Sequence, residues 1–170
     1  MRKLILAAAL ATSTAMVAAT PAPANAQTTT FSASRIINSF DIATLRAVVT
    51  ELGGTVEPKD DGNGYRIEFD NGTVTSAYFT ACNSGVCLGT HLQGSFGKPS
   101  DKTISETETI VTNFNKDNRT LKVWNLGEGR SMADHYIIAD GGITMENYRR
   151  QLSLYSYMLK RYREAIYTDG

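Results

Sequence analysis

The chain has 170 residues with 17 Lys and Arg, 17 Asp and Glu and two His, so its formal net charge is zero. This length allows one domain or two small ones, and it excludes large architectures such as a (β/α)₈ barrel, which needs about 250 residues. A balanced charge gives no reason to expect nucleic acid as a partner, because domains that bind it commonly have a pI above about 9.

The first 26 residues have the composition of a secretory signal peptide. Two basic residues precede an unbroken apolar run over residues 4–11, and residues 24–26 (Ala-Asn-Ala) have the small-x-small form of a cleavage site. The run is shorter than the roughly 20 apolar residues that span a bilayer, although a retained membrane anchor is the alternative. We predict a soluble mature chain of 144 residues from Gln27, with 15 basic and 17 acidic residues, no membrane span, and a periplasmic or secreted location.

The mature chain begins with a small, polar segment, residues 27–34, which predicts a flexible lead-in before a domain over residues 35–170. Apolar residues at steps of three and four then predict a helix between Asp41 and Leu52. Asp41 suits the N-cap, and Gly53-Gly54 suits the C-terminal end, because glycine adopts the left-handed conformation without a Cβ penalty.

The pattern then changes to that of strands. Residues 65–69 alternate between apolar and polar side chains, as in a strand with one exposed face. Asn71-Gly72 is a strong hairpin signal, so residues 73–81 are the expected return strand. A third strand is expected over residues 86–96, and the glycine-rich stretch before the first strand, residues 58–64, is expected to be a turn.

The residue pattern in the second half of the sequence predicts a helix over residues 103–115, strands over residues 119–126 and 131–139, and a last helix over residues 144–166. The last helix has an apolar stripe at alternating steps of three and four residues: Met145, Tyr148, Leu152, Tyr155, Leu159, Tyr162 and Ile166. The predicted fold class is α+β, with a single antiparallel sheet and the element order α-β-β-β-α-β-β-α.

Cys82 and Cys87 flank a four-residue loop between two predicted strands. In an exported protein such a pair is expected to form a disulfide that closes the hairpin, and the alternative is a thiol enzyme that uses Cys87 as its nucleophile. Neither His91 nor His135 has another His or Cys at metal-ligand spacing. We therefore expect no metal and no cofactor.

A hydrolytic site is not evident in the sequence either. No G-x-S-x-G elbow and no phosphate-binding loop is present. Asp134 and His135 are adjacent on a predicted strand, so their side chains point to opposite faces and cannot orient one another. We predict no catalytic residues, with a small hydrolase kept as an alternative.

Aromatic and arginine side chains suggest a surface that binds a partner, because Tyr, Trp and Arg are enriched at interfaces. The candidates are Trp124 on a predicted strand and Tyr148, Arg149, Tyr155 and Tyr162 on the last helix. The alternative for the tyrosines is packing in the core and at its rim.

These features together resemble the YbjN-like domain family, labelled bacterial sensory transduction regulators. The resemblance covers residues 41–166. It rests on these segments, in order: Asp-Ile-Ala-Thr-Leu at 41–45, Leu-Gly-Gly at 52–54, Cys-Asn-Ser-Gly-Val-Cys at 82–87, Leu-Gln at 92–93, Asn-Phe-Asn at 113–115 with Arg119, and Gly-Gly-Ile-Thr at 141–144.

The resemblance implies a fold like that of the class I type III secretion chaperones, which are homodimers that bind extended segments of other proteins. It implies no catalytic residues. From the resemblance, the absence of a catalytic set and the signal-peptide pattern, we expect a non-enzymatic, exported module. We expect it to bind a protein or peptide in a regulatory or chaperone-like role, as a homodimer. A small-ligand carrier, with a pocket between the sheet and the last helix, is a further alternative.

Overall fold

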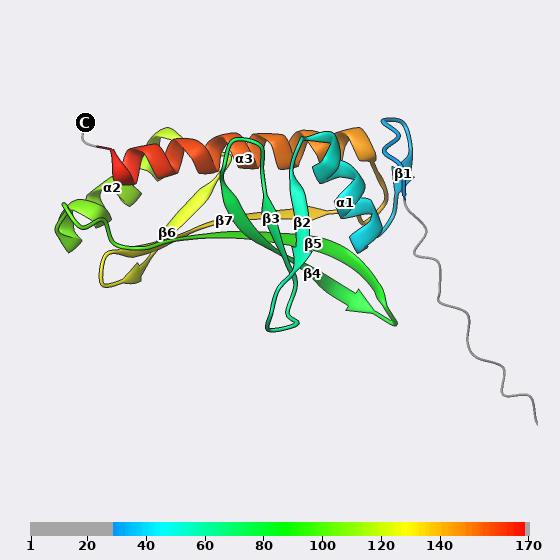
Figure 1. Ribbon diagram of the computed structural model, residues 1–170, viewed down its shortest axis with the longest axis horizontal. Coiled ribbons are helices and arrows are strands. Elements are labelled where there is room, and N and C mark those ends of the chain that lie inside the picture. Colours follow the sequence, from blue (N-terminus) through cyan, green and yellow to red (C-terminus); the bar gives the residue numbers. More distant parts are fainter. Residues whose placement is uncertain (1–28, 169–170) are drawn as a thin grey trace, which may run out of the picture.

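The computed structural model describes residues 29–168, so the predicted signal peptide lies outside the described residues. Figure 1 shows the arrangement of the elements. In chain order they are β1 (Ile36–Ile37), α1 (Ile42–Glu51), β2 (Thr55–Pro58), β3 (Tyr65–Glu68), β4 (Val74–Asn83), β5 (Val86–Phe96), α2 (Ile104–Asp117), β6 (Lys122–Gly127), β7 (Arg130–Ile138), β8 (Ile143–Thr144) and α3 (Met145–Tyr167).

The fold is α+β, but the strands form two sheets, so the expected single sheet is wrong. Six strands form an antiparallel sheet in the order β2-β3-β4-β5-β7-β6, and β1 pairs with β8 in a separate two-stranded sheet. Ile36 lies opposite Thr144, more than 100 residues away in the chain. Two-residue strands with so distant a partner carry no local pattern, which is why no strand was predicted over residues 36–37.

Strand β2 is the other difference from the expected order, because it makes four strands, not three, between the first two helices. Only Val56 of this strand is partly buried. Its short length, its place at the edge of the sheet and Pro58 at its end leave no alternating pattern to detect.

The helices begin where side chains can cap their free backbone N–H groups. The backbone N–H of Thr44 donates to Asp41 Oδ1 at 2.6 Å at the start of α1. At the start of α2, Thr103 and Glu106 form a capping box. Thr144 caps α3 by accepting the N–H of Asn147 at 3.0 Å. These caps fix each helix start within one residue of the predicted position.

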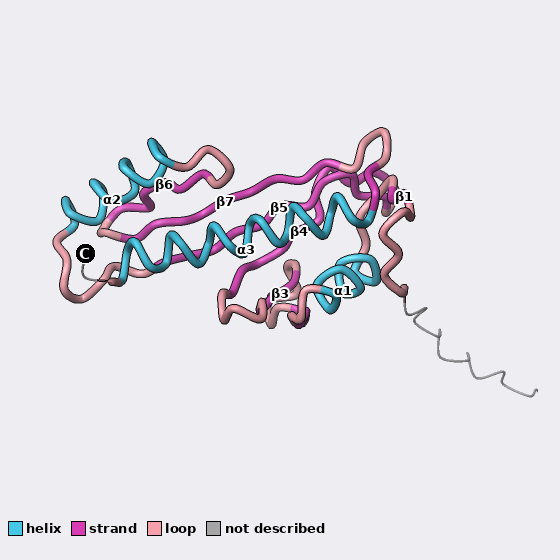
Figure 2. Tube along the Cα trace, turned by 90° about the horizontal axis from the view of Figure 1, so that it is seen from above, coloured by secondary structure: helices cyan, strands magenta, loops and turns pink. Residues whose placement is uncertain are grey.

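All three helices lie on one face of the six-stranded sheet, with α3 running along its length (Figures 1 and 2). Aromatic contacts join this layer. Phe40 lies 4.8 Å from Tyr148 at one end of α3, and Phe114 of α2 lies 5.0 Å from Tyr162 at the other, between ring centroids. Among residues 29–168, no helix has the length and apolar character needed to cross a bilayer.

Three tyrosines of α3, spaced seven residues apart, hydrogen-bond three hydroxyl groups on the sheet. The pairs are Tyr148 with Thr90 of β5 at 3.3 Å, Tyr155 with Thr75 of β4 at 2.8 Å, and Tyr162 with Ser131 of β7 at 2.6 Å. Because each buried hydroxyl has a partner, these bonds fix the position of α3 along three strands without leaving polar groups unsatisfied.

Candidate functional site

The three tyrosines proposed for partner binding are buried, so that part of the prediction is wrong. The exposed fractions of Tyr148, Tyr155 and Tyr162 are 0%, 2% and 0%. Burial raises the pKa of all three hydroxyls, to about 12 for Tyr162. A seven-residue spacing on a helix places side chains on one stripe, and the sheet covers that stripe.

The other two candidates lie in opposite layers. Arg149 is half-buried on α3, where Nε and Nη2 donate to the carboxylate of Glu146 at 2.6 and 2.7 Å. Arg149, and then Arg150, lower the pKa of Glu146 to about 2. Trp124 is half-buried on the side of the sheet away from the helices, opposite Met132. The five predicted residues therefore do not form one surface.

The side of the six-stranded sheet away from the helices, which we call the open face, is the best candidate site. Strand alternation defines it, because Thr75, Thr90 and Ser131 point to α3 and their neighbours point away. Within residues 29–168 no helix covers this face (Figure 1). Its side chains include Ser76, Tyr78 and Thr80 of β4, His91 and Gln93 of β5, Lys122 and Trp124 of β6, and Met132, Asp134, Tyr136 and Ile138 of β7.

An aromatic row crosses the centre of the open face. Tyr78, His91 and Tyr136 occupy directly paired positions on three neighbouring strands. The His91 ring centroid lies 6.4 Å from that of Tyr78 and 6.0 Å from that of Tyr136, with the rings tilted. Tyr136 is 45% exposed and Ile138, next to it on β7, is 56% exposed. The row therefore presents aromatic surface to solvent.

His91 is hydrogen-bonded through Nε2 to the carboxylate of Asp134. Both side chains are mostly buried, at 25% and 18% exposed. His135 points the opposite way, as predicted from its position beside Asp134, and stacks on Tyr155 beneath α3. Burial lowers the pKa of His135. The acidic partner of His91 is thus Asp134 on the neighbouring strand β7, whereas the side chains of Asp134 and the adjacent His135 point to opposite faces of the sheet.

The β2–β3 loop reaches one corner of the open face through Lys59. Its Nζ donates to the hydroxyl of Tyr78 at 3.0 Å and lies 3.3 Å from Asp61 Oδ2. The hydrogen bond from Lys59 lowers the pKa of Tyr78, and that same bond is the main cause that raises the pKa of Lys59. The lysine keeps the ring of Tyr78 in place at the edge of the row.

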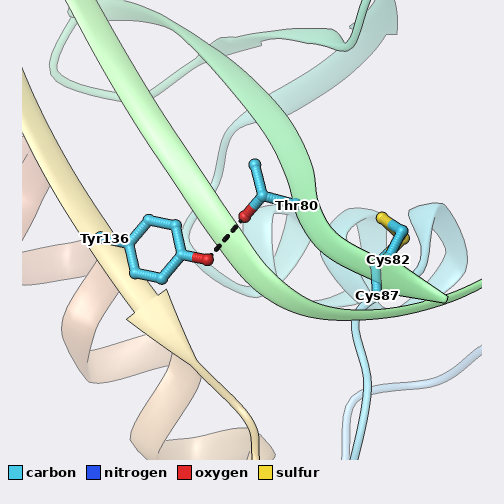
Figure 3. The surroundings of a disulfide bond; sticks show 4 residues. All are labelled: Thr80, Cys82, Cys87 and Tyr136. Atoms are coloured by element: carbon cyan, nitrogen blue, oxygen red, sulfur yellow. Dashed lines mark hydrogen bonds between the residues drawn. A yellow bond between two sulfur atoms is a disulfide. The ribbon is translucent and has the colours of Figure 1, made fainter.

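Tyr136 lies over Gly89 and is held there by Thr80, whose Oγ1 donates to the tyrosine hydroxyl at 2.8 Å (Figure 3). A Cβ on Gly89 would come within 2.1 Å of that hydroxyl, so glycine leaves the space that the ring uses. Beyond this contact Cys82 and Cys87 occupy paired positions and are joined by a disulfide (Figure 3).

Sequence reasoning missed the aromatic row and the His91–Asp134 pair. One signal was available, because the short loop between the cysteines sets the β4–β5 register and that register places Tyr78 opposite His91. No such signal existed for β7, which pairs with β5 across an intervening helix and strand. Within residues 29–168, no three His, Cys, Asp or Glu side chains group as metal ligands.

The fold and the open face define an α+β protein in which helices cover one face of an antiparallel sheet and a mixed aromatic and polar face remains uncovered. The family model described as "YbjN: Putative bacterial sensory transduction regulator" matches residues 41–168, so the chain belongs to the YbjN family. This confirms the resemblance. The family's description supports a regulatory role and is consistent with a protein that is not an enzyme.

A crystal structure of YbjN from E. coli, described as a putative transcription regulator, shares the fold with a TM-score of 0.52. The two sequences are 11% identical, and the match covers 80% of this chain and 100% of that chain. At this identity the likeness concerns the fold alone. No curated protein sequence matches the chain.

Proposed function

We propose that the protein is an exported, non-enzymatic regulatory module that binds an extended segment of another protein on the open face. The observation that carries this proposal is the exposed aromatic row on a sheet face that no described helix covers. Tyr, Trp and Met are enriched at interfaces, and the face presents Tyr136, Trp124 and Met132 beside polar groups that can pair with a backbone.

An extended segment suits the face better than a small ligand. The space between the sheet and α3, where a carrier would hold its ligand, is filled by Tyr148, Tyr155 and Tyr162. The chaperone-like character implied by the family resemblance also favours an extended client. The regulatory role then consists of holding or releasing that client.

Export is the second part of the proposal. It is supported by the signal-peptide pattern of residues 1–26 and by a disulfide between the two cysteines of the chain, which suits an oxidising compartment. The test is intact-mass spectrometry of the protein recovered from the periplasm of its bacterial host. A mature chain that begins at Gln27 is expected, and an uncleaved chain confined to the cytoplasm would contradict export.

Peptides selected from a phage-displayed library on the immobilised chain provide the binding test. Binding of the selected peptides is expected to weaken at least tenfold in Tyr136→Ala, a loss typical of a central aromatic contact. Tyr157→Ala is the matched control, because Tyr157 is 57% exposed on the outer side of α3. Equal loss in both variants, or loss only in Tyr157→Ala, would refute binding on the open face.

We also propose that the protein is a homodimer, as the family resemblance implies. Sedimentation equilibrium of the wild type and of Tyr136→Ala separates two arrangements. A dimer in both proteins is the expected result, since the open face is assigned to the client. A dimer lost in Tyr136→Ala would mean that a second copy occupies the face, and a monomer throughout would refute the dimer.

A small hydrolase is the second candidate, and the His91–Asp134 pair favours it, because such pairs orient a general base. Among residues 29–168, no hydroxyl or thiol side chain is hydrogen-bonded to His91, and both cysteines are joined to each other. The test is turnover of chromogenic ester substrates. Hydrolysis that is lost in His91→Ala would establish the enzyme and overturn the binding proposal.

A further inference from the structure

A strand residue beside the disulfide has an unfavourable backbone conformation. Ala81, the residue before Cys82 in β4, has φ +50°, in the left-handed region. This conformation is costly for residues with a Cβ, and a strand residue normally avoids it. On the β4 side of the hairpin, β3 pairs only as far as Ala77. On the β5 side, the backbone N–H groups of Ala139 and Phe40 donate to Leu88 O at 2.9 Å and to Cys87 O at 2.8 Å. Within residues 29–168, no strand pairs with the outer edge of β4 at Ala81, and the disulfide begins at the next residue, Cys82.

The disulfide is accessible and closes a short loop. Cys82 is exposed and Cys87 is half-buried. Four residues lie between the two cysteines, and a loop this short gains little stability from cross-linking. The core lies between the sheet and the helices, and the backbone N–H of Phe40, a core residue, donates to Cys87 O at 2.8 Å. Loss of the bond therefore removes a small share of the stability of the fold, and exposed or strained disulfides are the ones that reductants open most readily.

We propose that Cys82–Cys87 is a reversible redox element that a dithiol, such as a thioredoxin-type protein, opens while the domain stays folded. A thiolate of the dithiol attacks the sulfur of Cys82, the exposed residue of the pair, and Cys87 leaves as a thiolate and takes a proton. The second thiolate of the dithiol then attacks the mixed disulfide and releases Cys82 as a thiol. The protein gains two electrons and two protons, and the dithiol becomes a disulfide. Once the link is open, Ala81 returns to an extended conformation.

Thr80, which adjoins Ala81, connects this change in backbone conformation to the proposed binding surface. Thr80 lies two residues before Cys82 on β4, and Thr80 holds Tyr136 in place over Gly89 (Figure 3). Rotation of the backbone at Ala81 moves Thr80, which adjoins it. Reduction thus changes the position of Tyr136. A consequence for client binding rests on the proposed function, whereas the redox behaviour itself does not.

The test measures the thiol–disulfide equilibrium of the full chain in buffers of fixed ratios of reduced to oxidised dithiothreitol, with thiols counted by maleimide labelling and mass spectrometry. Three chains are compared: the wild type, Ala81→Gly, which adopts a positive φ freely, and Ala81→Val, which adopts it least readily. The equilibrium is expected to favour the disulfide about fivefold more in Ala81→Gly than in the wild type, and less in Ala81→Val. Ala165→Gly on α3 is the control and is expected to leave the equilibrium unchanged.

Two further measurements on the reduced protein test the proposal. The reduced wild type is expected to keep its far-ultraviolet circular dichroism, and its amide NMR signals are expected to shift at Thr80 and Tyr136 but not at Val123 on the distant strand β6. Equal equilibria in the three Ala81 chains would overturn the strain argument, and unfolding on reduction would overturn the reversible element. Neither measurement uses a client, so a failure here is distinct from a failure of the binding proposal.

Discussion

Replacing Tyr162 by phenylalanine removes one hydroxyl from the contact between α3 and the sheet and keeps the buried ring. In the structure this hydroxyl lies 2.6 Å from Ser131 Oγ, and both residues are fully buried. A buried hydroxyl that loses its partner costs about 1–3 kcal/mol. We therefore expect Tyr162→Phe to lower the free energy of unfolding by about 1–3 kcal/mol, or the melting temperature by about 3–10 °C for a domain of this size.

Urea unfolding followed by circular dichroism measures this change, and a double-mutant cycle assigns it to the pair. Ser131→Ala combined with Tyr162→Phe removes both polar groups, so the double variant is expected to be more stable than Tyr162→Phe alone. Tyr157→Phe, at an exposed position, is the control and is expected to change stability by less than about 0.5 kcal/mol. Additive losses in the cycle would refute the hydrogen bond.

Tyr162→Phe is also expected to change how the stability of the protein depends on pH in the alkaline range. Burial raises the pKa of Tyr162 from 10.0 to about 12, so the folded state keeps a proton that the unfolded state loses. The stability from this group is complete below pH 10 and is lost as the pH rises towards 12, at up to about 1.4 kcal/mol per pH unit. Between pH 10 and 11, stability is expected to fall less steeply in Tyr162→Phe than in the wild type. Equal slopes would contradict the burial of this hydroxyl.

Two further variants test other parts of the structure. Gly89→Ala would place a Cβ within 2.1 Å of the Tyr136 hydroxyl, so the ring signals of Tyr136 in NMR are expected to shift while stability falls by about 1 kcal/mol; unchanged signals would contradict the packing of the ring over Gly89. In Glu146, hydrogen bonds from Arg149 and then Arg150 lower the pKa from 4.5 to about 2, so its stabilising effect is present above pH 4.5 and is lost as the pH falls towards 2. Glu146→Gln is expected to remove this part of the acid dependence, and acid titrations that superimpose for the two proteins would show that Glu146 contributes none.

The sequence predicted the helices and the β3–β4 hairpin because their signals are local. The stripe from Met145 to Ile166 and the cap at Thr144 locate α3 within one residue at each end. The same stripe could not show what covers it, because a helix that packs on a sheet and a helix that binds a partner have the same spacing. The buried positions of Tyr148 and Tyr155 therefore needed the structure.

The open face illustrates the other limit of sequence reasoning. Tyr78 and His91 belong to one hairpin, so their pairing follows from the register that the cysteines set. Asp134 and Tyr136 meet His91 only because β7 pairs with β5 after α2 and β6 have intervened. Pairing between strands so far apart depends on burial of the whole sheet and not on any local pattern.

Site-specific photo-crosslinking in living cells shows whether another protein binds on the open face. A photoreactive phenylalanine analogue replaces Tyr136 in one chain and Tyr157, on the outer side of α3, in another. We expect adducts of this chain with a different protein from position 136 and none from position 157. Adducts from position 157 alone, or only adducts between two copies of the chain from position 136, would contradict binding of another protein on the open face.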